Sequence, residues 1–137
     1  MRFLLSIPVL AVVIIAYLLM GMGGSLMLDA DAYSATLASG AEFTLRAGDF
    51  FILAGLVALF IEMLKAARPG AGTIVDHMLS TATFVLALVC FLLVDYCGTP
   101  AFFLLAVMAL IDVVAGFSVS IFAARRDFSI GRGDSGL

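Results

Sequence analysis

Four long, mainly apolar runs of residues constrain this chain more than any other feature of its sequence. The first covers residues 3–21 and contains no charged side chain. The others cover residues 49–66, 77–94 and 100–124. A helix needs about 20 apolar residues to cross the hydrocarbon core of a bilayer, which is about 30 Å thick. The sequence therefore predicts an all-α membrane protein with four transmembrane helices.

The composition indicates that this fold is surrounded by lipid. Apolar residues make up 64% of the 137 residues and charged residues 12%, whereas soluble domains average about 45–50% and about 25%. A chain this short keeps much of its surface in contact with solvent, so a soluble core could not hide the excess. The net charge of −3 also offers no basic surface for nucleic acid. The expected partners are the lipid bilayer and other membrane subunits or copies of this chain.

The first run also has features of a secretory signal peptide, because Arg2 precedes it. The run is longer than the apolar core of a signal peptide, which has about 7–15 residues, and no small-x-small cleavage site ends it. We therefore expect a retained helix in which Pro8 causes a local bend.

Turn and capping residues separate the later runs. Pro69 cannot continue the second helix, Asp76 is placed to cap the third, and Thr99 and Pro100 are the expected N-cap and first residue of the fourth. Because both connections are short, neighbouring helices should be antiparallel. The predicted fold is therefore two antiparallel helical hairpins.

The basic residues predict the orientation. Six of the seven lie on one side of the four-span arrangement, with Arg46 alone on the other: Arg2, Lys65, Arg68, Arg125, Arg126 and Arg132. Positive charge collects on the cytoplasmic side of membrane proteins. We expect residues 1–124 to form the bundle, residues 22–48 an outer loop and residues 125–137 a cytoplasmic tail, with both termini in the cytoplasm. Within the loop, residues 28–37 are predicted to form a short surface helix, and residues 41–45 alternate small or apolar with polar side chains.

Several short stretches carry a family resemblance over residues 46–127. They are Glu62-x-x-Lys65, Asp76-His77-x-Leu79-Ser80, Phe102-Phe103-Leu104-Leu105, Leu110-Ile111-Asp112-Val113-x-x-Gly116 and Arg125-Arg126-Asp127. In these the chain resembles a family of small four-helix inner-membrane proteins of proteobacteria with no known activity. The resemblance implies the topology and a bacterial inner membrane, and it implies no site.

Asp112 is the most informative charged residue within the runs, because an Asp at the centre of a membrane helix costs about 2.5–3.5 kcal/mol. It begins a stripe with Gly116, Ser120 and Ala124 at every fourth residue, and small residues at this spacing favour close helix contact. The second helix carries a similar stripe of Ala54, Ala58 and Glu62. Counted from the cytoplasmic ends, Ala54 falls level with Asp112 and Glu62 level with Ser120. We therefore expect these two stripes to pack as a seam.

Two interpretations of Asp112 stay open. It is either a neutral carboxyl that hydrogen-bonds a neighbouring helix, with Tyr17 as the best partner at its depth, or a proton or cation site with Glu62 and His77 as a relay. We favour the packing interpretation, because few polar groups are expected at that depth. For Glu62 we expect an ion pair with Lys65, one turn away.

The remaining candidate sites favour structural roles. His77 has no second histidine to share a metal with, and the cluster Met20, Met22 and Met27 is weak evidence for copper. If Cys90 and Cys97 lie on one helix they are too far apart for a disulfide, which would require the backbone to break near Cys97; we expect two free thiols. No nucleophile-base spacing or phosphate loop appears in the sequence. We therefore predict no catalytic residues, no bound metal and no cofactor.

The predicted function is non-enzymatic and depends on helix association. The protein would act as a homo-oligomer or as an accessory or assembly subunit of a larger membrane complex. The alternative is a small proton-coupled or cation transporter or channel that uses Asp112.

Overall fold

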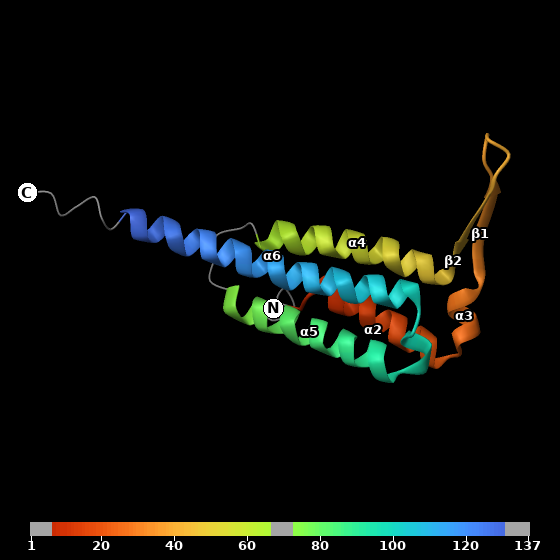
Figure 1. Cartoon of the computed structure of the whole chain (residues 1–137), viewed down its shortest axis with the longest axis horizontal. Helices are drawn as coiled ribbons and strands as arrows, with labels where there is room; N and C mark the ends of the chain where they lie inside the picture. Colours follow the sequence, from red (N-terminus) through yellow and green to blue (C-terminus); the bar gives the residue numbers. More distant parts are fainter. Residues whose placement is uncertain (1–6, 67–72, 131–137) are drawn as a thin grey trace, which may run out of the picture.

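The computed structural model of this chain describes residues 7–66 and 73–130, and it is mostly helical. Four long helices lie side by side along the long axis of the molecule (Figure 1): α2 (Val9–Met22), α4 (Ala47–Ala66), α5 (Thr73–Leu93) and α6 (Pro100–Ile130). A short helix and a two-stranded sheet lie between α2 and α4, at the end of the bundle that we name the hairpin end. The opposite end, where α4 ends and α5 begins, is named the α4–α5 end.

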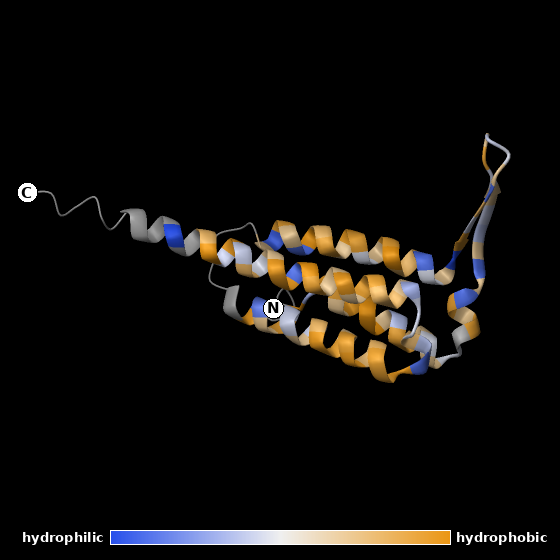
Figure 2. Ribbon diagram, in the orientation of Figure 1, coloured by the Kyte–Doolittle hydropathy of each residue, from blue (hydrophilic) through white to orange (hydrophobic). Residues whose placement is uncertain are grey.

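Three of these helices are long and apolar enough to cross a membrane. Their apolar parts are Ala47–Ala66, Val75–Leu93 and Pro100–Phe122, and Figure 2 shows the apolar residues covering the helices between their ends. They match three of the four predicted spans. The lengths and composition of these helices therefore support the expected all-α fold and a multi-pass membrane protein.

Helix α2 is shorter than predicted. It has 14 residues, which is about 21 Å at a rise of 1.5 Å per residue, and it begins at Val9 where residue 3 was expected. The physical reason is the extended backbone of Pro8, with φ −60° and ψ 125°, which ends any helical path at that point. Residues 1–6, the first part of the predicted run, lie outside the described residues.

The helix ends follow the local sequence in part. Phe102 N–H donates to Thr99 Oγ1 at 3.2 Å, and Pro100 is the first residue of α6, so the expected cap is confirmed. Asp76 does not cap α5, because this helix already begins at Thr73, and none of the described residues is a hydrogen-bond partner of the buried Asp76 Oδ1. Helix α6 continues to Ile130, so it includes the start of the predicted tail; residues 131–137 lie outside the described part.

The outer loop contains strands where a helix was predicted. Helix α3 (Ser25–Asp29) is followed by β1 (Asp31–Thr36) and β2 (Glu42–Arg46), which pair antiparallel. The helix expected over residues 28–37 is therefore wrong, whereas the alternating segment 41–45 lies largely in β2. The turn explains this, because Gly40 has φ +83° and Gly40 N–H donates to Leu37 O, a geometry that reverses a strand and cannot continue a helix.

Helix α6 is the centre of the bundle. It packs along both α4 and α5, while α2 packs mainly on α4. Tyr17 of α2 is fully buried, with its ring centroid 5.3 Å from that of Phe51 and 5.0 Å from that of Phe102. The aromatic core therefore joins α2, α4 and α6 towards the hairpin end.

Two sets of contacts fix the register of the helices. A Cβ at Gly55 of α4 would lie 2.6 Å from Leu105 Cδ2 and 2.9 Å from Met108 Sδ, and one at Gly48 would lie 3.5 Å from Ala101 Cβ. Helices α4 and α6 therefore run parallel, and Gly55 lets them approach closely. Helices α5 and α6 run antiparallel, because Phe91 pairs with Phe103 and His77 with Phe117, both at 5.6 Å between ring centroids.

The contact at Gly55 predicts a strong dependence on residue size. Gly55→Leu should force α4 from α6 and lower the free energy of unfolding by about 1–3 kcal/mol, the usual cost of overpacking. The matched control is Ala54→Leu, because Ala54 is exposed on the same turn. Thermal unfolding in one detergent would measure both variants, and equal stability of the two would contradict this α4–α6 contact.

Candidate functional site

Glu62 connects α4 to the start of α2. Its side chain is 8% exposed, and Glu62 Oε1 accepts a hydrogen bond from the N–H of Val9, the first residue of α2. The first N–H groups of a helix have no partner within it, and the N-terminus carries partial positive charge. Lys65 Nζ lies 3.1 Å from Glu62 Oε2, which confirms the predicted ion pair. One carboxylate thus caps a neighbouring helix and binds a lysine.

Asp112 lies within one helical turn of Glu62 in depth. Glu62 follows Gly55 by seven residues, and Asp112 follows Leu105, the contact of Gly55, by the same number. Gly55 also contacts Met108, and Gly48 contacts Ala101; in these parallel helices both contacts set Glu62 level with residue 115, which is three residues or about 4.5 Å beyond Asp112. Asp112 is also 8% exposed. The structure therefore places two buried carboxyl groups within one helical turn of each other in depth.

Helix α5 contributes a third buried polar residue near this level. Ser80 is 8% exposed and follows His77 by three residues, while Asp112 precedes Phe117, the stacking partner of His77, by five. In an antiparallel pair this places Ser80 and Asp112 within one helical turn in depth. We name Glu62, Ser80, Asp112 and the Val9 N–H the polar layer. Within the part of the chain that the structure describes, no hydrogen bond reaches the carboxyl of Asp112 or the hydroxyl of Ser80.

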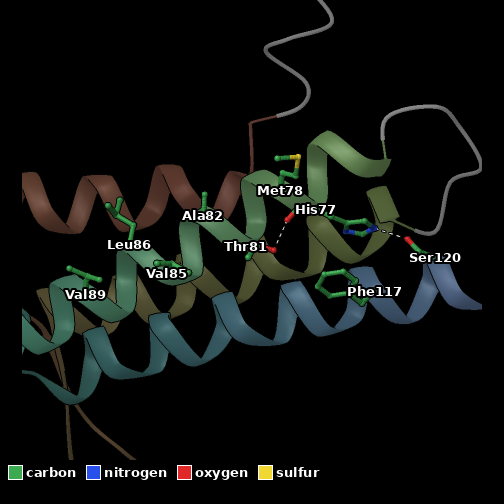
Figure 3. A pocket seen from close by; sticks show the side chains of 9 residues that line it. All are labelled: His77, Met78, Thr81, Ala82, Val85, Leu86, Val89, Phe117 and Ser120. Carbon is green, nitrogen blue, oxygen red and sulfur yellow. Dashed lines mark hydrogen bonds between the residues drawn. The ribbon is translucent and has the colours of Figure 1, made fainter.

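His77 lies nearer the α4–α5 end, between α5 and α6 (Figure 3). His77 Nε2 is 2.7 Å from Ser120 Oγ, and Ser120 Oγ donates to Gly116 O at 3.2 Å. The imidazole stacks on Phe117 with an interplanar angle of 15°, and a Cβ at Gly116 would overlap it. His77 is therefore held by α6 and is not simply a residue at a helix start.

The predicted seam between the second and fourth runs is wrong in its partners. Ala54 is exposed, and Gly55, Ala58 and Glu62 form the buried stripe of α4. Gly116 faces His77 of α5. The prediction counted depth from helix ends that were assumed to be level, whereas α6 continues to Ile130. Glu62 is therefore level with residues 112–115, within one turn of Asp112, and not with Ser120.

Tyr17 does not belong to the polar layer. Its hydroxyl is 2.6 Å from Thr99 Oγ1. Thr99 lies thirteen residues before Asp112, which is about 20 Å along the axis of α6. The expected partnership with Asp112 is therefore wrong. The expectation failed because α2 begins only at Val9, beside Glu62. Tyr17 therefore lies two helical turns nearer the hairpin end than Glu62 does.

The cysteines are free thiols, as expected. Cys97 is fully buried in the short 3₁₀ turn Asp95–Cys97. Burial first, and then the nearby Cys90, raise the pKa of the Cys97 thiol to about 11. Because the thiolate is the reactive form, Cys97 is not a nucleophile at neutral pH. Within residues 7–66 and 73–130, no three His, Cys, Asp or Glu side chains lie together in a way that could hold a metal ion.

Comparison with known proteins gives no match, since no family model, curated protein or solved structure is similar to this chain at a significant level. Function is therefore inferred from the residues and contacts described above.

The two contacts of Glu62, with the Val9 N–H and with Lys65, can be tested separately. Glu62→Ala leaves the Val9 N–H buried without a partner, so it should lower the free energy of unfolding by about 1–3 kcal/mol. Lys65→Ala removes only a partly exposed ion-pair partner and should cost less than about 1 kcal/mol. Thermal unfolding of both variants in detergent measures the difference. A Lys65 variant as unstable as the Glu62 variant would show that the ion pair, and not the helix cap, is the important contact.

Proposed function

We propose that this chain is a bacterial inner-membrane protein with four transmembrane helices in two antiparallel hairpins and both termini in the cytoplasm. It works by helix association and catalyses no reaction. It forms a homo-oligomer or serves as an accessory or assembly subunit of a larger membrane complex. Three long apolar helices, the adjacent apolar α2 and the six basic residues on one side support the topology.

The peripheral position of α5 is the observation that carries the association proposal. Only 11% of Val75–Leu93 is buried, against 44% of Pro100–Phe122, because α5 packs chiefly on α6. A groove of about 750 Å³ runs along this exposed side (Figure 3). Its apolar lining includes Met78, Ala82, Val85, Leu86 and Val89 of α5 and Phe117 of α6.

The groove suits a helix from another membrane subunit. Val89 follows Met78 by eleven residues of α5, about 16 Å of helix at 1.5 Å per residue. Ala82 in its middle is small, and small side chains allow neighbouring helices to approach closely in lipid, where van der Waals packing drives association. A partner helix would therefore gain contacts along three turns of α5.

The association proposal is tested by mass. The protein purified from native membranes in mild detergent should have a mass above that of the 14.4 kDa chain, either as a multiple or with a second subunit. Ala82→Trp fills the groove and should reduce the assembled fraction. Val57→Trp is the control, because Val57 is exposed on α4, away from the groove. Wild type that has the mass of one chain at all concentrations, without a bound subunit, would contradict association.

The polar layer favours a second function, which is proton or cation transport by an assembly of this chain. A transport site within a membrane usually brings several polar groups together at one depth, and the polar layer draws them from α2, α4, α5 and α6. Asp112 would be the proton- or cation-binding group, because Glu62 is engaged by Val9 and Lys65.

Asp112→Asn separates the two functions. Asn keeps the shape of the side chain, so stability should change by less than about 1 kcal/mol and assembly should persist. Under the association proposal, wild-type proteoliposomes show no flux driven by a pH or ion gradient. Wild-type flux that is abolished in a well-folded Asn variant would replace association by transport, since Asn cannot titrate.

A further inference from the structure

The β1–β2 hairpin has one apolar and one polar face. Its register pairs Tyr33 with Leu45 and Ala35 with Phe43, and it pairs Ser34 with Thr44 and Thr36 with Glu42. Residues directly opposite in an antiparallel pair share a face of the sheet. One face therefore carries Tyr33, Ala35, Phe43 and Leu45, and the other carries only hydroxyls and a carboxylate. We name them the apolar face and the polar face of the hairpin.

The described part of the chain leaves the apolar face largely uncovered. Tyr33 is 54% exposed and Phe43 is 42% exposed, while Ala35 and Leu45 are half-buried. An isolated two-stranded sheet is only marginally stable in water, and it needs a surface against which its apolar side can pack. The hairpin must therefore find that surface outside its own two strands.

The position of the hairpin indicates which surface this is. Figure 1 shows it at the end of the bundle, extending across the direction of the helix axes and past α4. With the helices crossing a bilayer, a segment that lies across their axes at their ends runs along the membrane surface. Strand β2 leads directly into α4, since Arg46 is the last residue of one and Ala47 the first of the other. The hairpin is thus held at the level where the lipid headgroups begin.

We propose that the hairpin lies on the outer leaflet, with its apolar face in the interfacial region of the lipid and its polar face in water. This inference rests on the membrane-spanning arrangement proposed above. Tyr and other aromatic side chains favour this region, where one side of a segment is apolar and the other is wet. Arg46 and Asp31, 4.0 Å apart at the base of the hairpin and both well exposed, remain in contact with the headgroups and water.

The contact anchors the protein to a lipid surface through a sheet and adds to the anchoring of the helices. Tyr33 and Phe43 supply most of the apolar area. Leu37, 50% exposed at the turn, follows Ala35 by two residues, so it continues the apolar face to the tip. Water at the interface hydrogen-bonds the free edges of both strands, which would be forbidden in the hydrocarbon core.

The chain contains no tryptophan, so a single introduced one reports its own surroundings. Phe43→Trp places it on the apolar face, and Thr44→Trp on the polar face at the next position of the same strand. Phe60→Trp, exposed on α4, is the control for membrane insertion. Each variant of the full chain is reconstituted into phosphatidylcholine–phosphatidylglycerol vesicles. Its fluorescence is measured with brominated lipids as membrane quenchers and with iodide as the aqueous quencher.

The proposal predicts opposite results for neighbouring positions. Trp at position 43 should show blue-shifted emission, loss of fluorescence with lipids brominated near the headgroup and protection from iodide, whereas Trp at position 44 should lose fluorescence to iodide. If position 43 is quenched by iodide as strongly as position 44, or if it is protected from both quenchers because a protein covers it, the lipid contact is wrong. Quenching at position 60 by brominated lipids in either case would show that the helices still lie in the membrane. Failure of the hairpin proposal is thus distinguishable from failure of the membrane-spanning arrangement.

Discussion

The hydrogen bond from Val9 N–H to Glu62 determines where α2 begins and how deep it lies. A helix that starts among apolar side chains has N–H groups that water cannot reach, and each unsatisfied group there costs free energy. Pro8 prevents the helix from extending towards the N-terminus, and the carboxylate of Glu62 accepts the hydrogen bond from the first N–H of the helix. With this end held beside α4, Tyr17 comes to lie between Phe51 and Phe102, and its hydroxyl reaches Thr99. A single capping contact thus aligns the core at the hairpin end.

Glycine allows the other helices to pack around α6. Gly55 brings the backbone of α4 against Leu105 and Met108, and Gly116 makes room on α6 for the imidazole of His77. The consequence for function is the polar layer, because these registers bring Glu62, Ser80 and Asp112 to nearly one depth. Packing in this bundle therefore positions buried polar groups as well as apolar ones.

Much of the fold could be predicted because hydrophobic length and capping act locally. The long apolar runs located α4, α5 and α6, Thr99 and Pro100 located the start of α6, and the spacing of Glu62 and Lys65 identified their ion pair. Strand β1 was not predicted, because residues 28–37 were assigned to a short helix. A segment of that length fits a helix or a strand, and the strand forms only by pairing with β2 across the turn at Gly40.

The site was predictable in its residues but not in its geometry. The sequence marked Glu62, Asp112, Gly116 and Ser120 as unusual, and all four are partly or wholly buried. Which of them lie level depends on where each helix begins and ends in depth. Pro8 marks the start of α2 in the sequence but was interpreted as a bend within a longer helix, and no local pattern encodes the length of α6. Tyr17 was misplaced for the same reason. Contacts between helices, rather than distances along the chain, determine which polar groups meet.

The most direct test of this account is the amide signal of Val9 in a ¹⁵N-labelled sample in detergent micelles. An N–H that donates to a buried carboxylate should have a downfield proton shift and slow exchange with solvent. Glu62→Gln should move this signal upfield, and Glu62→Ala should also speed its exchange, while amides of α5 such as that of Val89, in a helix that packs chiefly on α6, change little. A Val9 amide that exchanges rapidly in wild type, or whose shift is unaffected by both substitutions, would contradict the proposed role of Glu62 in fixing the start of α2.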